Sequence, residues 1–120
     1  MDRIDEIHKY YINEKKRILF IKKFKEILNN YDKYNEKKLK TNDLYLIENC
    51  YFNINDFDKA IEMLSEQQKN VITQLYVYKH SYEDASISLS LNESTIRTHE
   101  RRGLENLFNN VMELIIARLS

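Results

Sequence analysis

Two short stretches decide how this chain folds: Ser81-Tyr82-Glu83-Asp84 and Asn92-Glu93-Ser94-Thr95-Ile96-Arg97. Ser81 and Asn92 are residue types that cap helices, because their side-chain oxygens accept hydrogen bonds from free N–H groups of the first turn. Asp84 adds an acid where the helix dipole favours one. After Asn92 there is no proline, and the only glycine is Gly103. We therefore predict a short helix, a tight connection and a last helix of roughly 27 residues.

The segment before Ser81 extends this pattern. Ser65 followed by Gln68 predicts a capping box, and the helix after it has an apolar side made of Val71, Ile72, Leu75 and Tyr76. The short helix after Ser81 has its inward side at Tyr82, Ala85, Ser86 and Leu89. A short helix joined closely to a longer one is the spacing of a helix-turn-helix, whose second helix lies in the major groove of DNA.

The first half of the chain has weaker signals. Apolar residues three or four apart predict a helix over about residues 3–30, with a break near Glu14 and Lys15. A polar connector is expected over residues 31–41. A second helix is expected over residues 42–52, with Leu44, Ile47 and Tyr51 on one side, and Asn55 or Asp56 then caps a short helix that runs through Leu64.

Composition limits the class of protein. A chain of 120 residues with one glycine and no proline is expected to be all-α, as a helical bundle with a long N-terminal helix. Cys50 is the only cysteine, so no internal disulfide is expected, which fits a reducing cytosol. No apolar run reaches the ~20 residues of a membrane span and no signal peptide opens the chain. A cytoplasmic protein without membrane contact is predicted.

Charge is unevenly distributed along the chain. The formal net charge is zero, which argues against a protein that holds DNA by bulk electrostatics alone. A basic run comprises Lys15, Lys16, Arg17, Lys22, Lys23 and Lys25. This run is either a solvated helix face or a second contact with nucleic acid or polymerase. From residue 59 onward seven basic residues face eight acidic ones, which favours help from a partner or a second copy.

One ordered set of residues runs through the second half: Leu64-Ser65-Glu66-Gln67-Gln68, Val71-Ile72, Leu75-Tyr76, Ser81-Tyr82-Glu83, Leu89, Asn92, Ser94-Thr95-Ile96-Arg97, Leu104 and Leu107. It resembles region four of bacterial RNA polymerase sigma factors, and equally the phage transcription regulators of the ArpU and RinA type. The resemblance implies a helical module whose last helix reads a promoter element, while other surfaces contact the polymerase or an activator. Residues 55–120 would form this domain, and residues 1–54 a helical extension.

The resemblance also implies roles for individual residues. Ser94, Arg97 and Thr98 would face base edges, and Arg101 and Arg102 phosphates or bases; this face lies opposite Ile96, Leu104 and Leu107. An arginine can donate two hydrogen bonds to guanine. Backbone N–H groups at Tyr82 and Glu83, beside the Ser81 hydroxyl, would hold a phosphate. The DNA-binding residues expected are Ser81, Tyr82, Ser94, Thr95, Arg97, Thr98, Arg101 and Arg102.

Several positions depart from the family pattern. Asp84-Ala85-Ser86 stands where Glu-Ile-Ala is usual, so Ala85 replaces a bulky core residue. Ile87 stands where a polar residue is usual, and Glu93 where many relatives are basic. Ser90 replaces the glycine of the turn, which costs little if its φ is negative. Upstream of residue 54 nothing resembles sigma region two, so promoter melting is not implied.

The end of the chain is apolar on more than one face, so it needs more than one neighbour. One reading is that this segment packs on the N-terminal helix and completes a single core. The other is a homodimer seam or partner interface that comprises Ile87, Val111, Met112, Ile115 and Leu119.

Two functions follow from these observations. The first is a sequence-specific, DNA-binding transcription regulator of sigma-region-four type, bacterial or phage, that acts on double-stranded DNA with or near RNA polymerase. The alternative is a protein-interaction module that keeps the fold and binds RNA polymerase or a sigma factor without reading DNA. No catalytic set, nucleotide-binding loop or cofactor site is indicated. No second His or Cys stands at metal-ligand spacing from His99, so no metal and no enzyme activity are expected.

Overall fold

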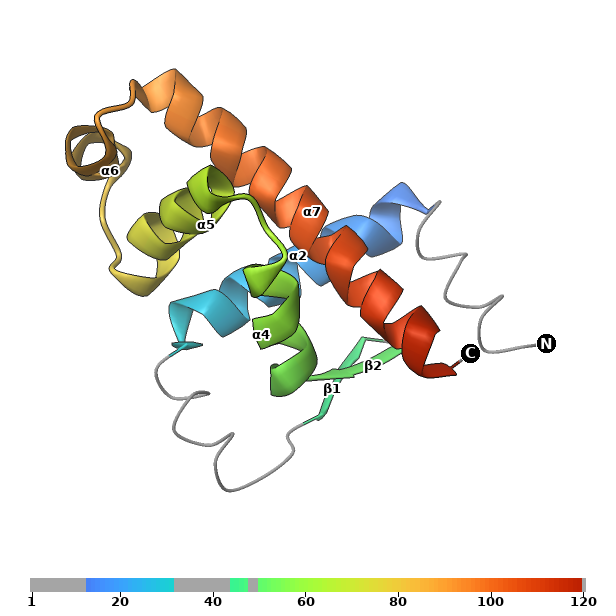
Figure 1. The fold of residues 1–120 in the computed structure, drawn as a ribbon. Helices are drawn as coiled ribbons and strands as arrows, with labels where there is room; N and C mark the ends of the chain where they lie inside the picture. The colour runs from blue at the N-terminus through green and yellow to red at the C-terminus, as the bar shows by residue number, and fades with distance from the viewer. Residues whose placement is uncertain (1–12, 32–43, 48–49, 120) are drawn as a thin grey trace.

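The computed structural model describes residues 13–31, 44–47 and 50–119. In chain order its elements are α2 (Glu14–Asn29), β1 (Leu44–Ile47), β2 (Cys50–Asn53), α4 (Ile54–Glu62), α5 (Glu66–Ile72), the π-helical turn η1 (Thr73–Val77), α6 (Tyr82–Leu89) and α7 (Glu93–Leu119) (Figure 1). The predicted helical bundle with a last helix of 27 residues is confirmed. A small two-stranded sheet is added to it.

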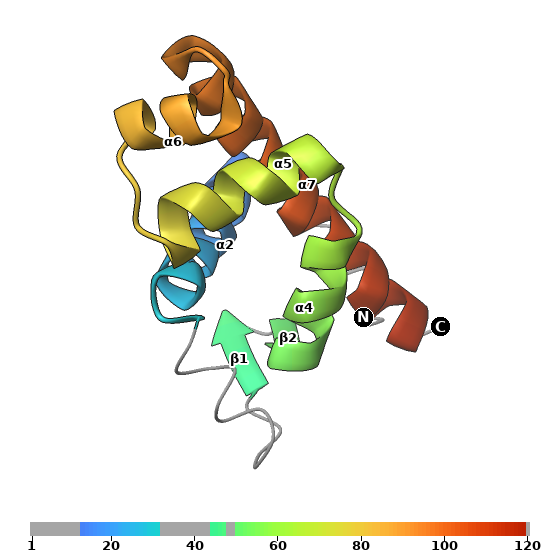
Figure 2. The ribbon, with the colours of Figure 1, turned by 60° about the vertical axis from the view of Figure 1, so that its left-hand side comes forward.

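Helix α7 is the element around which the others are arranged. It contacts α2, α4, α5, α6 and β2, and the two ribbon views show it running past all of them (Figures 1 and 2). Helix α6 lies near its beginning, while α4 and the hairpin lie near its end. At Gly103 a Cβ atom would stand 2.7 Å from Cδ1 of Ile72, so glycine is what allows α5 to approach α7 this closely.

The main core lies between α2, α4, β2 and the second half of α7. All five phenylalanines of the chain are buried in it. Phe20 of α2 and Phe108 of α7 meet edge to face with ring centroids 5.6 Å apart, and Phe24 meets Phe52 in the same way at 5.5 Å. Such aromatic pairs add to the large area that each ring removes from water. The N-terminal extension and the second half of the chain therefore share one core.

Helix α2 begins where the sequence predicted a break. Asn13 is its N-cap, and the Asn13 side chain accepts a hydrogen bond from the Lys16 backbone N–H at 3.1 Å. The earlier part of the predicted helix, before Asn13, lies outside the described residues, as does the predicted connector beyond Tyr31. Within the described part α2 has 16 residues.

The helix predicted over residues 42–52 is wrong. Leu44–Ile47 and Cys50–Asn53 are antiparallel strands, with Leu44 opposite Asn53 and Ile47 opposite Cys50. Both stretches are short and rich in aromatic and branched residues, which suits strands. Asn53, rather than Asn55 or Asp56, caps α4: its side chain accepts from the Asp56 backbone N–H at 2.9 Å, and Asp56 accepts from the Asn53 N–H at 3.2 Å.

The apolar end of α7 completes the core of its own chain. Val111, Met112 and Ile115 are buried among side chains of α2, α4 and β2. These three residues are therefore occupied within one chain, and the dimer seam predicted from them is not supported. The side chain of Leu119 lies outside the described residues. Ile87, the remaining member of the predicted interface, is 72% exposed on α6.

Candidate nucleic-acid interface

Helices α6 and α7 form the predicted helix-turn-helix. Ser81 caps α6 by accepting a hydrogen bond from the Asp84 N–H at 3.0 Å, and Asn92 caps α7 by accepting from the Thr95 N–H at 2.8 Å. A small buried cluster of Val71, Ala85 and Ile96 joins α5, α6 and α7. The space left by the small Ala85 side chain is covered by the partly buried Leu75, Tyr82, Leu89 and Leu91. This cluster sets the angle at which α7 leaves the turn.

The turn between the two helices contains a left-handed residue. Ser90 has φ 55° and ψ 41°, so the negative φ expected for it is wrong. This conformation lets the Leu91 N–H donate to the Ser86 carbonyl at 3.1 Å, which is the long hydrogen bond of a Schellman cap. The Ser86 hydroxyl also donates to the Leu91 carbonyl. A cost of about 1–2 kcal/mol is typical of a non-glycine residue in this region.

Replacing Ser90 by glycine should therefore stabilise the protein by about 0.5–1 kcal/mol, because glycine adopts this φ without strain. Chemical denaturation would measure the gain. Ser88→Gly is the matched control: Ser88 is exposed inside α6, where glycine should cost about 0.5–1 kcal/mol. Equal effects of the two substitutions would contradict the assigned turn.

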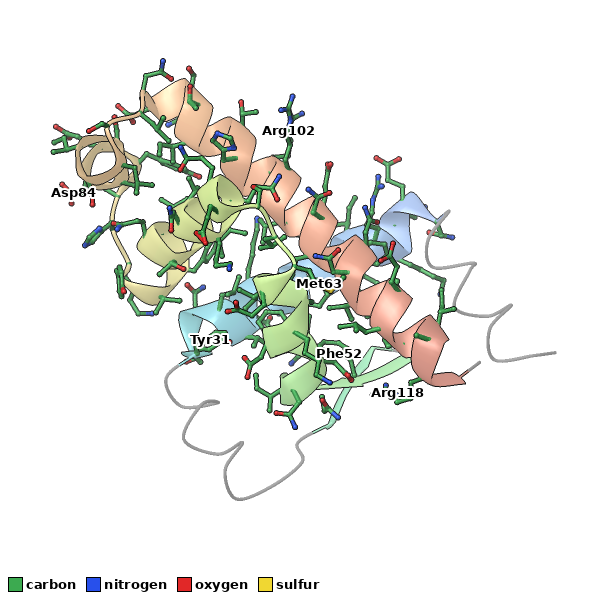
Figure 3. All side chains as sticks on the ribbon, viewed as in Figure 1. Tyr31, Phe52, Met63, Asp84, Arg102 and Arg118 are labelled. Carbon is green, nitrogen blue, oxygen red and sulfur yellow. The ribbon has the colours of Figure 1, made fainter. Side chains whose placement is uncertain are left out.

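The first half of α7 presents one exposed face. Ser94, Arg97, Arg101 and Arg102 are exposed, and Thr95 and Thr98 are half-buried. Ile96, Leu104 and Leu107 on the other side of the helix are buried. Arg102 points away from the bundle at the same end of the molecule as Asp84 of α6 (Figure 3). The structure thus brings the predicted α7 residues onto one accessible surface.

The hydroxyl groups on this surface are engaged within the chain. Ser94 donates to the Asn92 side chain at 2.8 Å, and Thr98 donates to the Ser94 carbonyl at 3.0 Å. Each oxygen keeps accepting capacity, but its proton is committed to the helix. The donors that remain for reading base edges are the guanidinium groups of Arg97, Arg101 and Arg102.

Arg97 is held in place by a partner from α6. Its guanidinium carbon lies 4.6 Å from the centre of the Tyr82 ring, a cation–π geometry. The Tyr82 hydroxyl in turn donates to Glu100 at 2.7 Å, and the Tyr76 hydroxyl donates to the other oxygen of the same carboxylate at 2.7 Å. Glu100 thus links η1, α6 and α7. Sequence analysis found neither this role of Glu100 nor that of Tyr76, because the partners are 24 and 18 residues away.

The shared carboxylate and the packing around it favour the protonated phenols. Burial, followed by the hydrogen bond to Glu100, raises the pKa of Tyr76 well above its ordinary value. For Tyr82 the hydrogen bond to Glu100 comes first and burial second in raising the pKa, while Arg97 acts in the opposite direction. The two phenols are therefore held neutral on the acceptor that positions them.

The pKa shift of Tyr76 predicts a loss of stability in alkaline solution. In the unfolded chain this phenol loses its proton near pH 10, whereas the folded chain retains it. From that pH upward the unfolded state binds fewer protons, so the free energy of unfolding falls by at most about 1.4 kcal/mol per pH unit for this group. Below it the effect vanishes. Tyr76→Phe should show a shallower decline in denaturation experiments above pH 10, compared with the wild type and with Tyr78→Phe at an exposed position. Identical declines in all three proteins would contradict this linkage.

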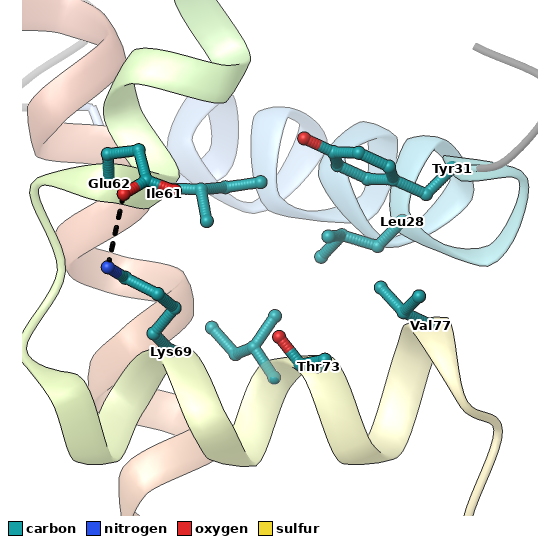
Figure 4. Close-up of a pocket in the computed structure, with 8 residues that line it drawn as sticks. Leu28, Tyr31, Ile61, Glu62, Lys69, Thr73 and Val77 are labelled. Atoms are coloured by element: carbon teal, nitrogen blue, oxygen red, sulfur yellow. Dashed lines mark hydrogen bonds and ion pairs between the residues drawn. The ribbon is translucent and has the colours of Figure 1, made fainter. Parts of the chain in front are cut away.

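Other features of the described residues do not indicate chemistry. A pocket of about 240 Å³ between α2, α4 and η1 is lined mainly by apolar side chains, with Lys69 and Glu62 paired at 3.3 Å (Figure 4). None of the predicted DNA-contacting residues lines it. Within the described ranges no group of three or more His, Cys, Asp or Glu is placed to hold a metal ion. No helix there is both long and apolar enough to span a bilayer.

Comparison with known proteins identifies the helical segment around this surface. Residues 54–107 match the family model described as sigma-70, region 4. The matched range begins with α4 and ends inside α7, so it contains the whole helix-turn-helix and leaves out α2, the hairpin and the end of α7. No match was found among curated proteins or among solved structures.

Proposed function

Because residues 54–107 belong to the sigma-70 region 4 family, we propose that this protein is a sequence-specific transcription regulator that binds promoter DNA with or near RNA polymerase. It acts in the cytoplasm of a bacterium, as a cellular or a phage protein. Membership in the family makes the segment a DNA-binding helix-turn-helix related to sigma factors. The finer role as a regulator is our proposal.

The observation that carries this proposal is the exposed arginine row on the first half of α7. Arg97, Arg101 and Arg102 are exposed on a capped helix that follows a short capped helix. The first turns of such a second helix are the part that enters the major groove. Arginine reads guanine there through two parallel hydrogen bonds. Arg97, held on the Tyr82 ring, loses less side-chain entropy on binding than a free arginine would.

The N-terminus of α6 is the proposed phosphate contact. The Tyr82 and Glu83 N–H groups belong to the first turn of α6, where the backbone donors and the helix dipole favour an anion. The Ser81 hydroxyl accepts from the Asp84 N–H and still has its own proton to donate. A phosphate held there would set the register of α7 without contributing to sequence selectivity.

A protein partner is part of the proposal. Glu83, Asp84 and Glu93 are exposed around the helix-turn-helix and oppose the attraction of phosphates, so DNA affinity from these two helices alone should be modest. RNA polymerase is the partner that the family suggests. Ile87, exposed on the same helix as Glu83 and Asp84, is a candidate contact for it.

The decisive experiment is a genome-wide DNA pull-down of the tagged full chain, with polymerase subunits scored in the same eluate. We expect a limited set of promoter fragments, together with polymerase. Binding of the enriched fragments should then weaken as salt is raised and should exceed binding of unrelated duplexes. Recovery of polymerase with no enriched DNA would overturn the proposal and favour the protein-interaction module.

A further inference from the structure

Helix α2 lies against the same side of α7 that carries the reading face. Ile21 and Lys25 of α2 line one hollow of about 190 Å³ together with Arg101, Leu104, Glu105 and Glu100 of α7. One turn further along α7, Phe108 packs on Phe20. Positions 101, 104, 105 and 108 fall on one side of a helix, so α2 crosses α7 directly after the exposed arginines. Both ribbon views show this crossing (Figures 1 and 2).

The outward side of α2 is basic at this crossing. Lys22 and Lys25 are exposed one helical turn apart, and Lys15 is exposed two turns before Lys22. The opposite side of α2 is buried in the core through Phe20, Phe24, Ile27 and Leu28. Among the described residues, neither Lys22 nor Lys25 forms an ion pair. The basic run found in the sequence is therefore placed beside Arg101 by the fold.

We propose that α2 is a second DNA-contacting element, in which Lys22 and Lys25 bind the phosphate backbone next to the site that α7 reads. This inference rests on the proposed function, because it concerns the same DNA. It adds a binding surface outside residues 54–107, the range that matches the family. We call the surface made of Lys15, Lys22 and Lys25 the α2 strip.

The geometry favours phosphates over bases as the ligand of the α2 strip. The major groove, about 12 Å wide, admits one helix, and packed helices lie about 8–10 Å apart. When α7 enters the groove with its first turns, α2 is held beside the groove, where the sugar-phosphate backbone rises. A lysine ammonium is a point charge on a flexible stem, which suits a phosphate better than a base edge.

The charge distribution of the whole chain supports the same assignment. From residue 59 onward basic and acidic residues nearly cancel, so the helix-turn-helix by itself gains little from neutralising phosphates. Helix α2 carries six basic residues against two acidic ones. Glu105 lines the hollow between the α2 strip and α7, and Lys22, Lys25 and Arg101 outweigh it. Docking α2 against α7 thus supplies positive charge where the reading helix lacks it.

The test compares the double variant Lys22→Gln/Lys25→Gln with the wild type over a range of salt concentrations, using a duplex from the enriched fragments. Each lost phosphate contact should reduce the slope of log K against log salt by about 0.9. The preference for this duplex over an unrelated one should stay unchanged. Lys59→Gln is the matched control, because Lys59 is an exposed lysine on α4, beside the hairpin and away from α6.

A second measurement locates the contact. Trimming the duplex from the end beyond the α2 side of the site should weaken the wild type and leave the double variant unaffected. Wild-type binding with an unchanged slope in the double variant would overturn the inference and leave the proposed function intact. Absence of any wild-type DNA binding would overturn both.

Discussion

Replacing Phe108 by alanine is expected to lower the free energy of unfolding by about 3–5 kcal/mol. Phe108 is fully buried where α7 meets α2, edge to face with Phe20. Truncation removes a large apolar side chain from water-free surroundings and leaves a cavity between two helices that other buried rings hold apart. A loss of this size is a large fraction of the 5–15 kcal/mol that typically stabilises a domain.

Urea unfolding followed by circular dichroism would measure this loss. Glu113→Ala serves as the control, because Glu113 is exposed on the same helix and such substitutions usually change stability by less than about 0.5 kcal/mol. If Phe108→Ala unfolds at the same urea concentration as the control, the packing of α2 on α7 is wrong. The placement of the α2 strip would then fail with it.

Replacing Arg97 and Arg101 by alanine is expected to reduce specific DNA affinity by about 1–3 kcal/mol for each arginine that reads a base. The two substitutions should differ in detail. Arg97→Ala also removes the cation–π contact with Tyr82, whereas Arg101 is exposed beside the α2 strip. Loss of Arg101 should therefore act mainly on binding, with little effect on folding.

Fluorescence anisotropy at one fixed salt concentration would measure both variants, with circular dichroism confirming that helix content is kept. Arg118→Ala is the matched control: it lies on the same helix, at the opposite end, where Arg118 bonds to Asp56 at 2.6 Å. If the variants at 97 and 101 bind as tightly as the control, the DNA surface does not lie on the first half of α7.

The sequence predicted best what depends on neighbouring residues. The caps at Ser65, Ser81 and Asn92 each accept the expected backbone hydrogen bond, because a cap is decided within one helical turn. At Ser65 only the hydroxyl acts as predicted. The side-chain oxygen of Gln68 instead accepts from Asn106 of α7 at 3.2 Å. A distant neighbour therefore competed with the local pattern.

The features that sequence analysis missed depend on contacts between distant segments. Leu44 and Ile47 fit the apolar side of a helix as well as a strand, and only the pairing with Cys50–Asn53 decides between them. The broad apolar surface at Val111 and Ile115 indicated two neighbours, yet not that both belong to the same chain. Likewise, the bonds that Tyr76 and Tyr82 make to Glu100 follow from the packing of α6 on α7, which no short pattern in the sequence reveals.

The unequal packing along α7 has a consequence for hydrogen exchange. Its second half is anchored in the phenylalanine core, whereas its first half rests on the cluster of Val71, Ala85 and Ile96. Opening free energies vary within one fold according to such local burial. Backbone amides of α6 and of the first turns of α7 should therefore take up deuterium sooner than those around Phe108, although one unbroken helix carries both. Bound DNA should slow the uptake at the faster end, and that end is where the arginines lie.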